Sequence, residues 1–154
     1  MRLRFAIPLA LLALAAPLAA CGESEKDKYI DDFKPLNDKL LDLGSELGGA
    51  VGGADSQSDA ALAKQFGGLA RRLEGVNEEI ADLDTPSDLE DEAKTLNDKI
   101  DAAVGDLEEI EKAAQENNAE DAAAATVQLA TDSEAVNKAQ NKLAKATGAA
   151  VGEK

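Results

Sequence analysis

Apolar residues recur along the middle of the chain in alternating steps of four and three. One set lies between residues 62 and 83: Leu62, Phe66, Leu69, Leu73, Val76, Ile80 and Leu83. A second set follows the same steps: Leu89, Ala93, Leu96, Ile100, Ala103, Leu107, Ile110 and Ala114. Because this spacing places each set on one face of a helix, the pattern predicts two long helices that pack along heptad seams.

Two further helices flank this pair. The first is predicted from the spacing of Ile30, Phe33, Leu36, Leu40, Leu43 and Leu47. Pro35 falls inside it and would cost a helix interior about 3 kcal/mol, so the firm helix either begins at Pro35 or kinks there. The last helix runs through Leu129, Val136 and Leu143 and ends at Gly148.

Capping residues separate the predicted helices. Ser56-Gln57-Ser58-Asp59 is a plausible start for the second helix, and Asn118 is placed to cap the fourth. Thr85-Pro86-Ser87-Asp88 has the components of a capping box, with proline at the first helical position, so the third helix is predicted to start there.

The two halves of the chain match when they are offset by 60 residues. Leu36-Asn37-Asp38-Lys39-Leu40 aligns with Leu96-Asn97-Asp98-Lys99-Ile100, and the match extends to the second helix of each half. We therefore predict an all-α fold, an antiparallel up-down four-helix bundle over residues 28–148 built from a duplicated helical hairpin, 28–87 and 88–147. Residues 149–154 are predicted to form a disordered tail.

Four asparagines occupy matching places in the two repeats: Asn37, Asn77, Asn97 and Asn137. Each follows a seam residue, so all four are expected at one level beside the core. They could form one hydrogen-bonded layer that holds the helices in register, or a polar ring that binds a ligand.

The fourth helix differs from its duplicate in a row of polar residues. Thr126, Ser133 and Gln140 occupy the positions that correspond to Phe66, Leu73 and Ile80. Either this row lines an interior pocket together with Asn137, or the helix rotates its alanines inward and leaves the row at the surface. In the first case the row is the best candidate for a small-molecule site.

Glycines gather at one end of the predicted bundle. Gly48, Gly49, Gly67 and Gly68 lie at one level beside Phe66, and the second repeat lacks them. Phe66, Gly67 and Gly68 therefore join the candidate binding residues, since helix glycines indicate close helix approach or a deformable end. The nearby Arg71-Arg72 doublet is expected to pair with acids on another helix.

The N-terminus has the features of an export signal. Arg2 and Arg4 precede an apolar run from Phe5 to Pro17 that is too short to span a bilayer. Leu18-Ala19-Ala20-Cys21 follows and resembles the lipobox of bacterial lipoproteins. That resemblance implies removal of residues 1–20 and acylation of Cys21, followed by a short linker over residues 21–27. The nearby Tyr29 would either anchor at the membrane interface or cap the core.

Charge and composition narrow the function. Removing residues 1–20 takes Arg2 and Arg4 from the 16 basic residues, so 14 basic residues face 31 acidic ones, a formal charge of −17. This charge argues against binding nucleic acid. The chain has no histidine, and lipidation would use its one cysteine, Cys21, so we expect no catalytic site, no metal site and no cofactor.

Two functions fit these features. The first is a non-enzymatic binding or interaction module that is lipid-anchored through Cys21 in the cell envelope, with an envelope protein as one kind of partner. The alternative is a structural spacer on the membrane surface with no specific ligand. A binding module predicts an interior cavity or an apolar patch in the third of the bundle farthest from the membrane, and a spacer predicts neither. The sequence leaves the oligomeric state and the choice of membrane open.

Overall fold

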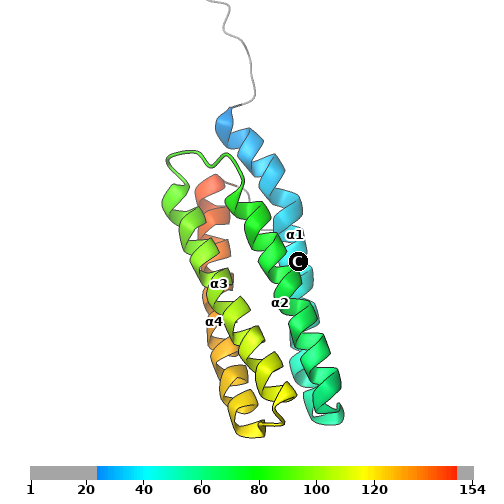
Figure 1. The fold of residues 1–154 in the computed structure, drawn as a ribbon. Helices are drawn as coiled ribbons and strands as arrows, with labels where there is room; N and C mark the ends of the chain where they lie inside the picture. Colours follow the sequence, from blue (N-terminus) through cyan, green and yellow to red (C-terminus); the bar gives the residue numbers. More distant parts are fainter. Residues whose placement is uncertain (1–23, 149–154) are drawn as a thin grey trace, which may run out of the picture.

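The computed structural model describes residues 24–148, which form four α-helices and no strand. The bounds are α1 Glu25–Gly52, α2 Asp59–Ala81, α3 Glu90–Gln115 and α4 Ala119–Thr147, with a short 3-10 helix, Ala54–Ser56, after α1. The predicted all-helical bundle is therefore confirmed (Figure 1). The signal over 1–20, the lipidation site Cys21 and the tail over 149–154 lie outside the described residues.

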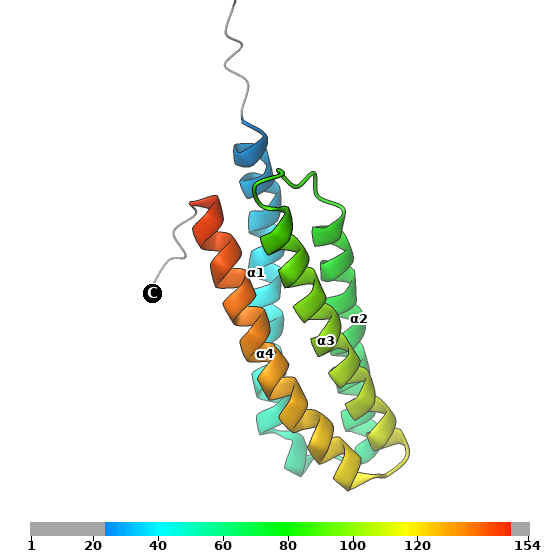
Figure 2. The same ribbon diagram turned by 90° about the vertical axis from the view of Figure 1, so that its left-hand side faces the viewer.

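The helices pack unequally. α3 lies between α2 and α4 and packs along both, whereas α1 contacts α2 and, less extensively, α4 (Figures 1 and 2). The start of α1, the α2–α3 connection and the end of α4 lie at one end of the bundle, which we call the Ser24 end. The other two connections lie at the opposite end, which we call the Asn117 end.

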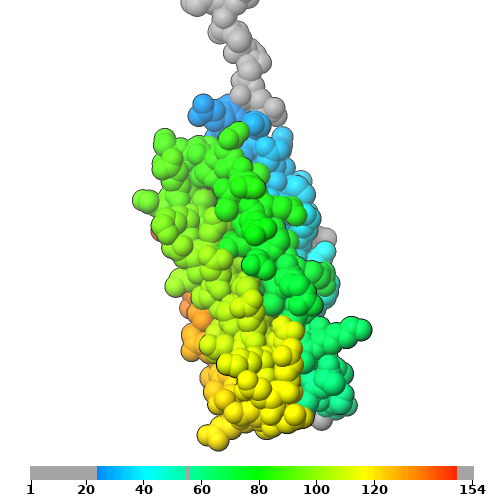
Figure 3. All heavy atoms as spheres, in the orientation of Figure 1, coloured from blue at the N-terminus to red at the C-terminus, as the bar shows by residue number. Residues whose placement is uncertain are grey.

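The centre of the core is the heptad seam of α3. Every residue of the predicted seam from Leu89 to Ala114 is buried, and Leu96 and Ile100 have no exposed surface. The seam of α2 is buried at Phe66, Leu69 and Ile80 and half-buried at Leu73. Figure 3 shows α2 and α3 covering one face of the bundle together. The alternating steps in the sequence therefore identified the core of these two helices.

Three helices begin at a capped residue. Ser24 caps α1 with a reciprocal bond to Asp27, the Ser58 hydroxyl accepts from the Ala61 N–H, and the Asn118 side chain accepts from the Asp121 N–H. The expected caps of α2 and α4 are confirmed. α1 begins before the predicted linker over 21–27 ends.

The predicted capping box at residues 85–88 is wrong. α3 begins at Glu90, after a turn in which the Leu89 N–H donates to the Pro86 carbonyl oxygen at 2.8 Å. The turn carries Leu89 into the core, where it is 1% exposed. Burying a leucine contributes about 1.5 to 3 kcal/mol, whereas a side-chain cap contributes about 1 kcal/mol, so burial decides where the helix starts.

Pro35 does not mark the start of the first helix, because α1 is already helical from Glu25. Tyr29 and Phe33 hold this first part in place. Both are buried, and their rings stack with centroids 5.8 Å apart. Tyr29 therefore caps the core in this structure, and the two aromatic side chains offset the cost of the proline that follows.

The four asparagines do not form one layer. The Asn77 amide donates to Asp101 at 2.6 Å and to the Asn97 carbonyl oxygen at 3.4 Å, which joins α2 to α3. Asn37 instead accepts from Gln140 at 2.7 Å, which joins α1 to α4. The expected single layer is wrong because α1 pairs with Gln140 and leaves Asn137 exposed.

Candidate functional site

A groove runs between α1 and α4 in the half of the bundle toward the Asn117 end. It encloses about 550 Å³ and is lined by Leu40, Leu41, Gly44, Leu47, Gly48, Val51, Thr126, Val127, Leu129, Ala130, Ser133 and Asn137. Both walls follow the steps of four, three and four that mark a helix face, from Leu40 to Val51 and from Thr126 to Asn137. The groove is therefore a stretch of helix–helix seam that is left uncovered.

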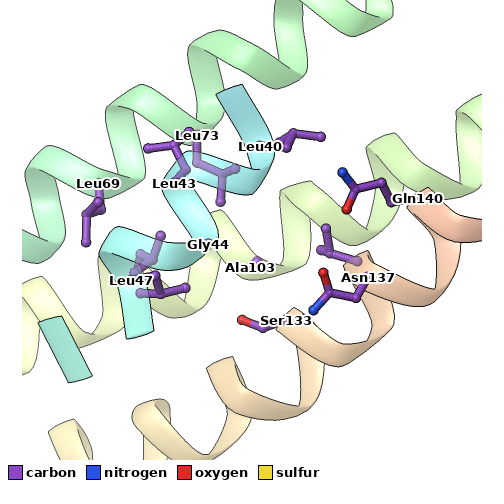
Figure 4. A pocket seen from close by; sticks show the side chains of 12 residues that line it. Leu40, Leu43, Gly44, Leu47, Leu69, Leu73, Ala103, Ser133, Asn137 and Gln140 are labelled. Carbon is purple, nitrogen blue, oxygen red and sulfur yellow. The ribbon is translucent and has the colours of Figure 1, made fainter. Parts of the chain in front are cut away.

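A cavity continues from the groove into the bundle. It has a volume of about 70 Å³ and shares Leu40, Gly44, Leu47, Ser133 and Asn137 with the groove. Leu69 and Leu73 of α2 and Ala103 and Leu107 of α3 form its inner wall. Figure 4 shows leucines of α1 and α2 on one side of the cavity and polar side chains of α4 on the other.

Small residues explain why this space is unfilled. α1 presents Gly44 and Gly48 to the groove, and a Cβ built on either would meet no atom within 4 Å. α4 presents short side chains at Thr126, Ala130 and Ser133. Thr126 and Ser133 stand where α2 carries Phe66 and Leu73, and with the two glycines of α1 they are too small to close the gap.

Polar contacts close the groove on the side of the Ser24 end. Gln140, which is 8% exposed, donates to Asn37 at 2.7 Å, and Lys26 donates to the Ala146 carbonyl oxygen at 2.7 Å. Among the described residues, no hydrogen bond or ion pair joins α1 to α4 beyond Asn37 toward the Asn117 end. The two helices are therefore tied at one end of their contact and open at the other.

The opposite side of α1 is tied to α2. Arg72 forms a forked ion pair with Glu46, with one hydrogen bond of 2.9 Å, and Lys39 donates to Glu79 at 2.6 Å. The Arg72 hydrogen bond lowers the pKa of Glu46. The expected pairing of the Arg71-Arg72 doublet with an acid on another helix is confirmed for Arg72. Both pairs lie at the exposed side of the α1–α2 contact, where ion pairs contribute little to stability.

Exposed apolar side chains gather at this groove. Leu41, Val51 and Val127 are the exposed large hydrophobic residues of the described chain, at 51%, 38% and 71% exposure. All three line the groove. Scattered apolar residues are ordinary on a protein surface, but three that share one concave site indicate a contact surface.

The structure brings part of the predicted site together. Thr126, Ser133 and Asn137 line the groove, and Ser133, Asn137 and Gln140 line the cavity. Neither alternative for α4 holds alone, because Ala125 and Ala139 turn into the core while Thr126 and Ser133 face the groove and Gln140 is buried at the cavity.

Phe66, Gly67 and Gly68 do not line the groove or the cavity. Phe66 is core, at 2% exposure. Gly67 is buried against the carboxylate of Glu111, so its small size permits a close approach of that α3 side chain. Gly68 has open space around it. Of the glycines in the predicted cluster, Gly48 belongs to the groove.

Sequence reasoning missed Gly44, Leu41 and Val127. Leu41 and Val127 are apolar residues that lie outside the heptad seams of their helices. An apolar residue outside a seam is the one signal in the sequence that could have marked an exposed contact surface.

Sequence reasoning also missed Asp106 of α3, a residue with a carboxyl group that is only 7% exposed. Burial, a hydrogen bond with Asp132 of α4 and the charges of Asp132 and Glu109 raise the pKa of Asp106 to about 6. Two carboxylates that meet in a partly buried contact cannot both ionise freely. Asp106 lies apart from the groove lining, so this pair is a cost to stability beside the candidate site.

Other kinds of site lack support within residues 24–148. No group of three or more His, Cys, Asp or Glu residues there is placed to hold a metal ion. No helix in this range is long and apolar enough to cross a membrane.

Comparisons with protein families, with curated proteins and with solved structures find no match to this chain.

Proposed function

We propose that this chain is a lipid-anchored, non-enzymatic binding module of the bacterial cell envelope, and that its contact site is the groove between α1 and α4. The observation that carries the proposal is the joint presence of a cavity and an exposed apolar patch at one place. A spacer needs neither feature, whereas a binding module needs a concave, mostly apolar surface with a few polar groups.

The lipid anchor in this proposal rests on Leu18-Ala19-Ala20-Cys21. Acyl chains on Cys21 would hold the Ser24 end near the membrane, since Cys21 precedes Ser24 by three residues. In an antiparallel up-down bundle with a duplicated hairpin, which we propose as the origin of this fold, the Asn117 end then points away from the bilayer. The groove would lie in that outer half, within reach of other envelope molecules.

The chemistry of the groove favours binding over catalysis. Ser133 is the one serine in the lining, and no carboxylate, lysine or arginine stands beside it there to act as a base. A serine hydroxyl is a weak nucleophile without an adjacent base. The groove residues can hold a molecule by apolar contact and hydrogen bonds.

Photo-crosslinking in cells that produce the full chain tests the proposal. A benzoylphenylalanine would replace Val127, and a matched variant would carry it at Lys94, an exposed position of α3 outside the groove. We expect a distinct crosslinked species at position 127 that is absent at position 94. Equal patterns at both positions, or none at either, would favour the spacer.

The anchor has its own test. Cells fed an alkyne fatty acid should label the wild-type chain and should not label Cys21→Ser. Label that persists in Cys21→Ser would refute acylation at this residue while leaving the groove proposal open.

A further inference from the structure

The lining of the groove and cavity carries no charged side chain, although 31% of the residues in the chain are charged. Two hollows elsewhere on the described surface differ, since one is lined in part by Glu109 and Lys112 and the other by Lys64 and Arg71. Apolar surface gains free energy when it leaves water, whereas an unpaired charge loses it. The groove therefore suits an uncharged, largely apolar ligand.

The dimensions of the site favour a slender ligand. The groove volume of about 550 Å³ lies within the range of about 300 to 1,000 Å³ found for small-molecule sites. From Leu41 to Val51 the groove follows α1 for about 15 Å at 1.5 Å per residue. The cavity of about 70 Å³ is smaller than the engineered cavities of about 150 Å³ that accept benzene. A flexible hydrocarbon chain fits this shape better than a ring system does.

Polar groups that are free to bind lie on one wall only. Ser133 and Asn137 line both the groove and the cavity, and neither side chain forms a hydrogen bond with another described residue. Thr126 donates to the Ala122 carbonyl oxygen and Gln140 donates to Asn37, so those two are already engaged. A hydroxyl and an amide can each donate and accept, which suits a hydroxyl or ester group.

We propose that the ligand of this groove is an uncharged single-chain amphiphile of the monoacylglycerol type. Its hydrocarbon chain would lie along Gly44 and Gly48, and its polar end would bond to Ser133 and Asn137. This inference rests on the proposed binding function. The strong net negative charge of the chain adds a reason to reject a free fatty acid, whose carboxylate would enter an acidic surface without a cationic partner.

The test uses a monoacylglycerol with a photoreactive diazirine and an alkyne in its acyl chain, added to membranes that contain the full chain. After irradiation, labelled peptides are mapped by mass spectrometry. Unlabelled 1-monolauroylglycerol and laurate then compete with the probe, because they share one hydrocarbon chain and differ in head group charge. We expect labels on the groove segments of α1 and α4, and competition by the glyceride at roughly tenfold lower concentration than by laurate.

Variants separate the groove from the rest of the surface. Gly44→Leu fills the groove and should reduce labelling roughly tenfold, the equivalent of about 1.4 kcal/mol. Gly75→Leu in α2 is the matched control, since a Cβ there also meets no atom within 4 Å and Gly75 does not line the groove. Dodecane serves as a competitor that has a hydrocarbon chain and no head group. Asn137→Leu should weaken competition by 1-monolauroylglycerol more than competition by dodecane.

Several outcomes would overturn this inference. Equal competition by laurate would refute selection for an uncharged head group. Labels spread over the surface, or unchanged in Gly44→Leu, would refute the groove as the site. If the benzoylphenylalanine at position 127 captures another protein or a second copy of this chain while the lipid probe does not label the groove, the ligand class is wrong and the binding function stands.

Discussion

The two halves of the contact between α1 and α4 differ although the same two helices form both. Toward the Ser24 end, buried side chains and the Gln140–Asn37 hydrogen bond close the contact. Toward the Asn117 end, the contact opens into a groove that contains Gly44 and Ser133. Both halves keep the helical spacing of seam positions, so the size of the residues at those positions decides whether two neighbouring helices close or leave a site.

The largest expected difference between the halves is the cost of removing a leucine. Leu36→Ala, in the closed half, should lower the free energy of unfolding by about 2 to 5 kcal/mol because Leu36 is buried. Leu47→Ala should cost about 1 kcal/mol, since Leu47 is half-buried beside existing space. Urea denaturation measures both, with Ile100→Ala as a reference for the centre of the core. Equal costs at residues 36 and 47 would contradict the comparison.

The second prediction concerns a buried carboxylate at the contact between α3 and α4, in the half of the bundle toward the Asn117 end. Asp106→Asn should raise the free energy of unfolding at pH 7 by about 1 to 3 kcal/mol, because the amide removes a carboxylate that is desolvated by burial and faces the like charge of Asp132. The pKa of Asp106 is raised from 3.8 to about 6 in the folded chain, so the folded state binds this proton more tightly than the unfolded state. The stability of the wild type relative to the variant should therefore fall as pH rises from about 4 to about 6.

Above about pH 7 the difference between wild type and Asp106→Asn should be constant, because Asp106 is then ionised in both the folded and the unfolded state. Denaturation at pH 4, 5, 6 and 8 measures the trend. Glu109→Gln is the control, since Glu109 is exposed and contributes less to the shift. A difference that grows as pH falls would contradict the assigned direction.

The hydrogen bond that ends the groove should have a smaller effect. Asn37→Leu should lower the free energy of unfolding by about 1 to 2 kcal/mol, because the buried Gln140 amide loses its acceptor. The double variant with Gln140→Leu should recover part of this loss, since no buried donor then remains unpaired. Hydrogen exchange should also show α1 opening farther toward the Ser24 end in Asn37→Leu. Additive costs in the double variant would mean that the two residues act independently.

The smallest effects are expected at glycines. Gly44→Ala and Gly48→Ala should each raise the free energy of unfolding by about 0.5 to 1 kcal/mol, because alanine favours a helix and its Cβ meets open space. Gly67→Ala should gain less or lose stability, since its Cβ would collide with the carboxylate of Glu111 and force that side chain aside. Thermal unfolding of the three variants checks this order. A larger gain at Gly67 would mean that Glu111 moves freely.

Much of the fold could be predicted from local pattern. The seams of α2 and α3 and the caps at Ser58 and Asn118 follow from spacing and side-chain chemistry, because these act over a few residues of one helix. The polar row at Thr126 and Ser133 was visible for the same reason, as a departure from an apolar seam. The duplicated hairpin and the acylation of Cys21 remain predictions from the sequence.

The start of α3 depended on tertiary packing. Thr85-Pro86-Ser87-Asp88 has good local capping chemistry, but burial of Leu89 places the helix start at Glu90. The pairing of Asn37 with Gln140 likewise depends on how two helices distant in sequence face each other. Capping and spacing rules consider one helix at a time. The start of α3 and the Asn37–Gln140 hydrogen bond instead depend on contacts between residues that are far apart in the chain.

The sequence by itself determined which residues are apolar, small or polar on each helix, and therefore that four amphipathic helices must share a core. Only the tertiary structure decided that the small and polar positions of α1 and α4 face each other. A glycine or serine on a seam is compatible with a closed contact or with a groove, because the neighbouring helix determines whether the space is filled. The candidate site exists because α1 packs more extensively on α2 than on α4 and carries Gly44 and Gly48 at its edge toward α4.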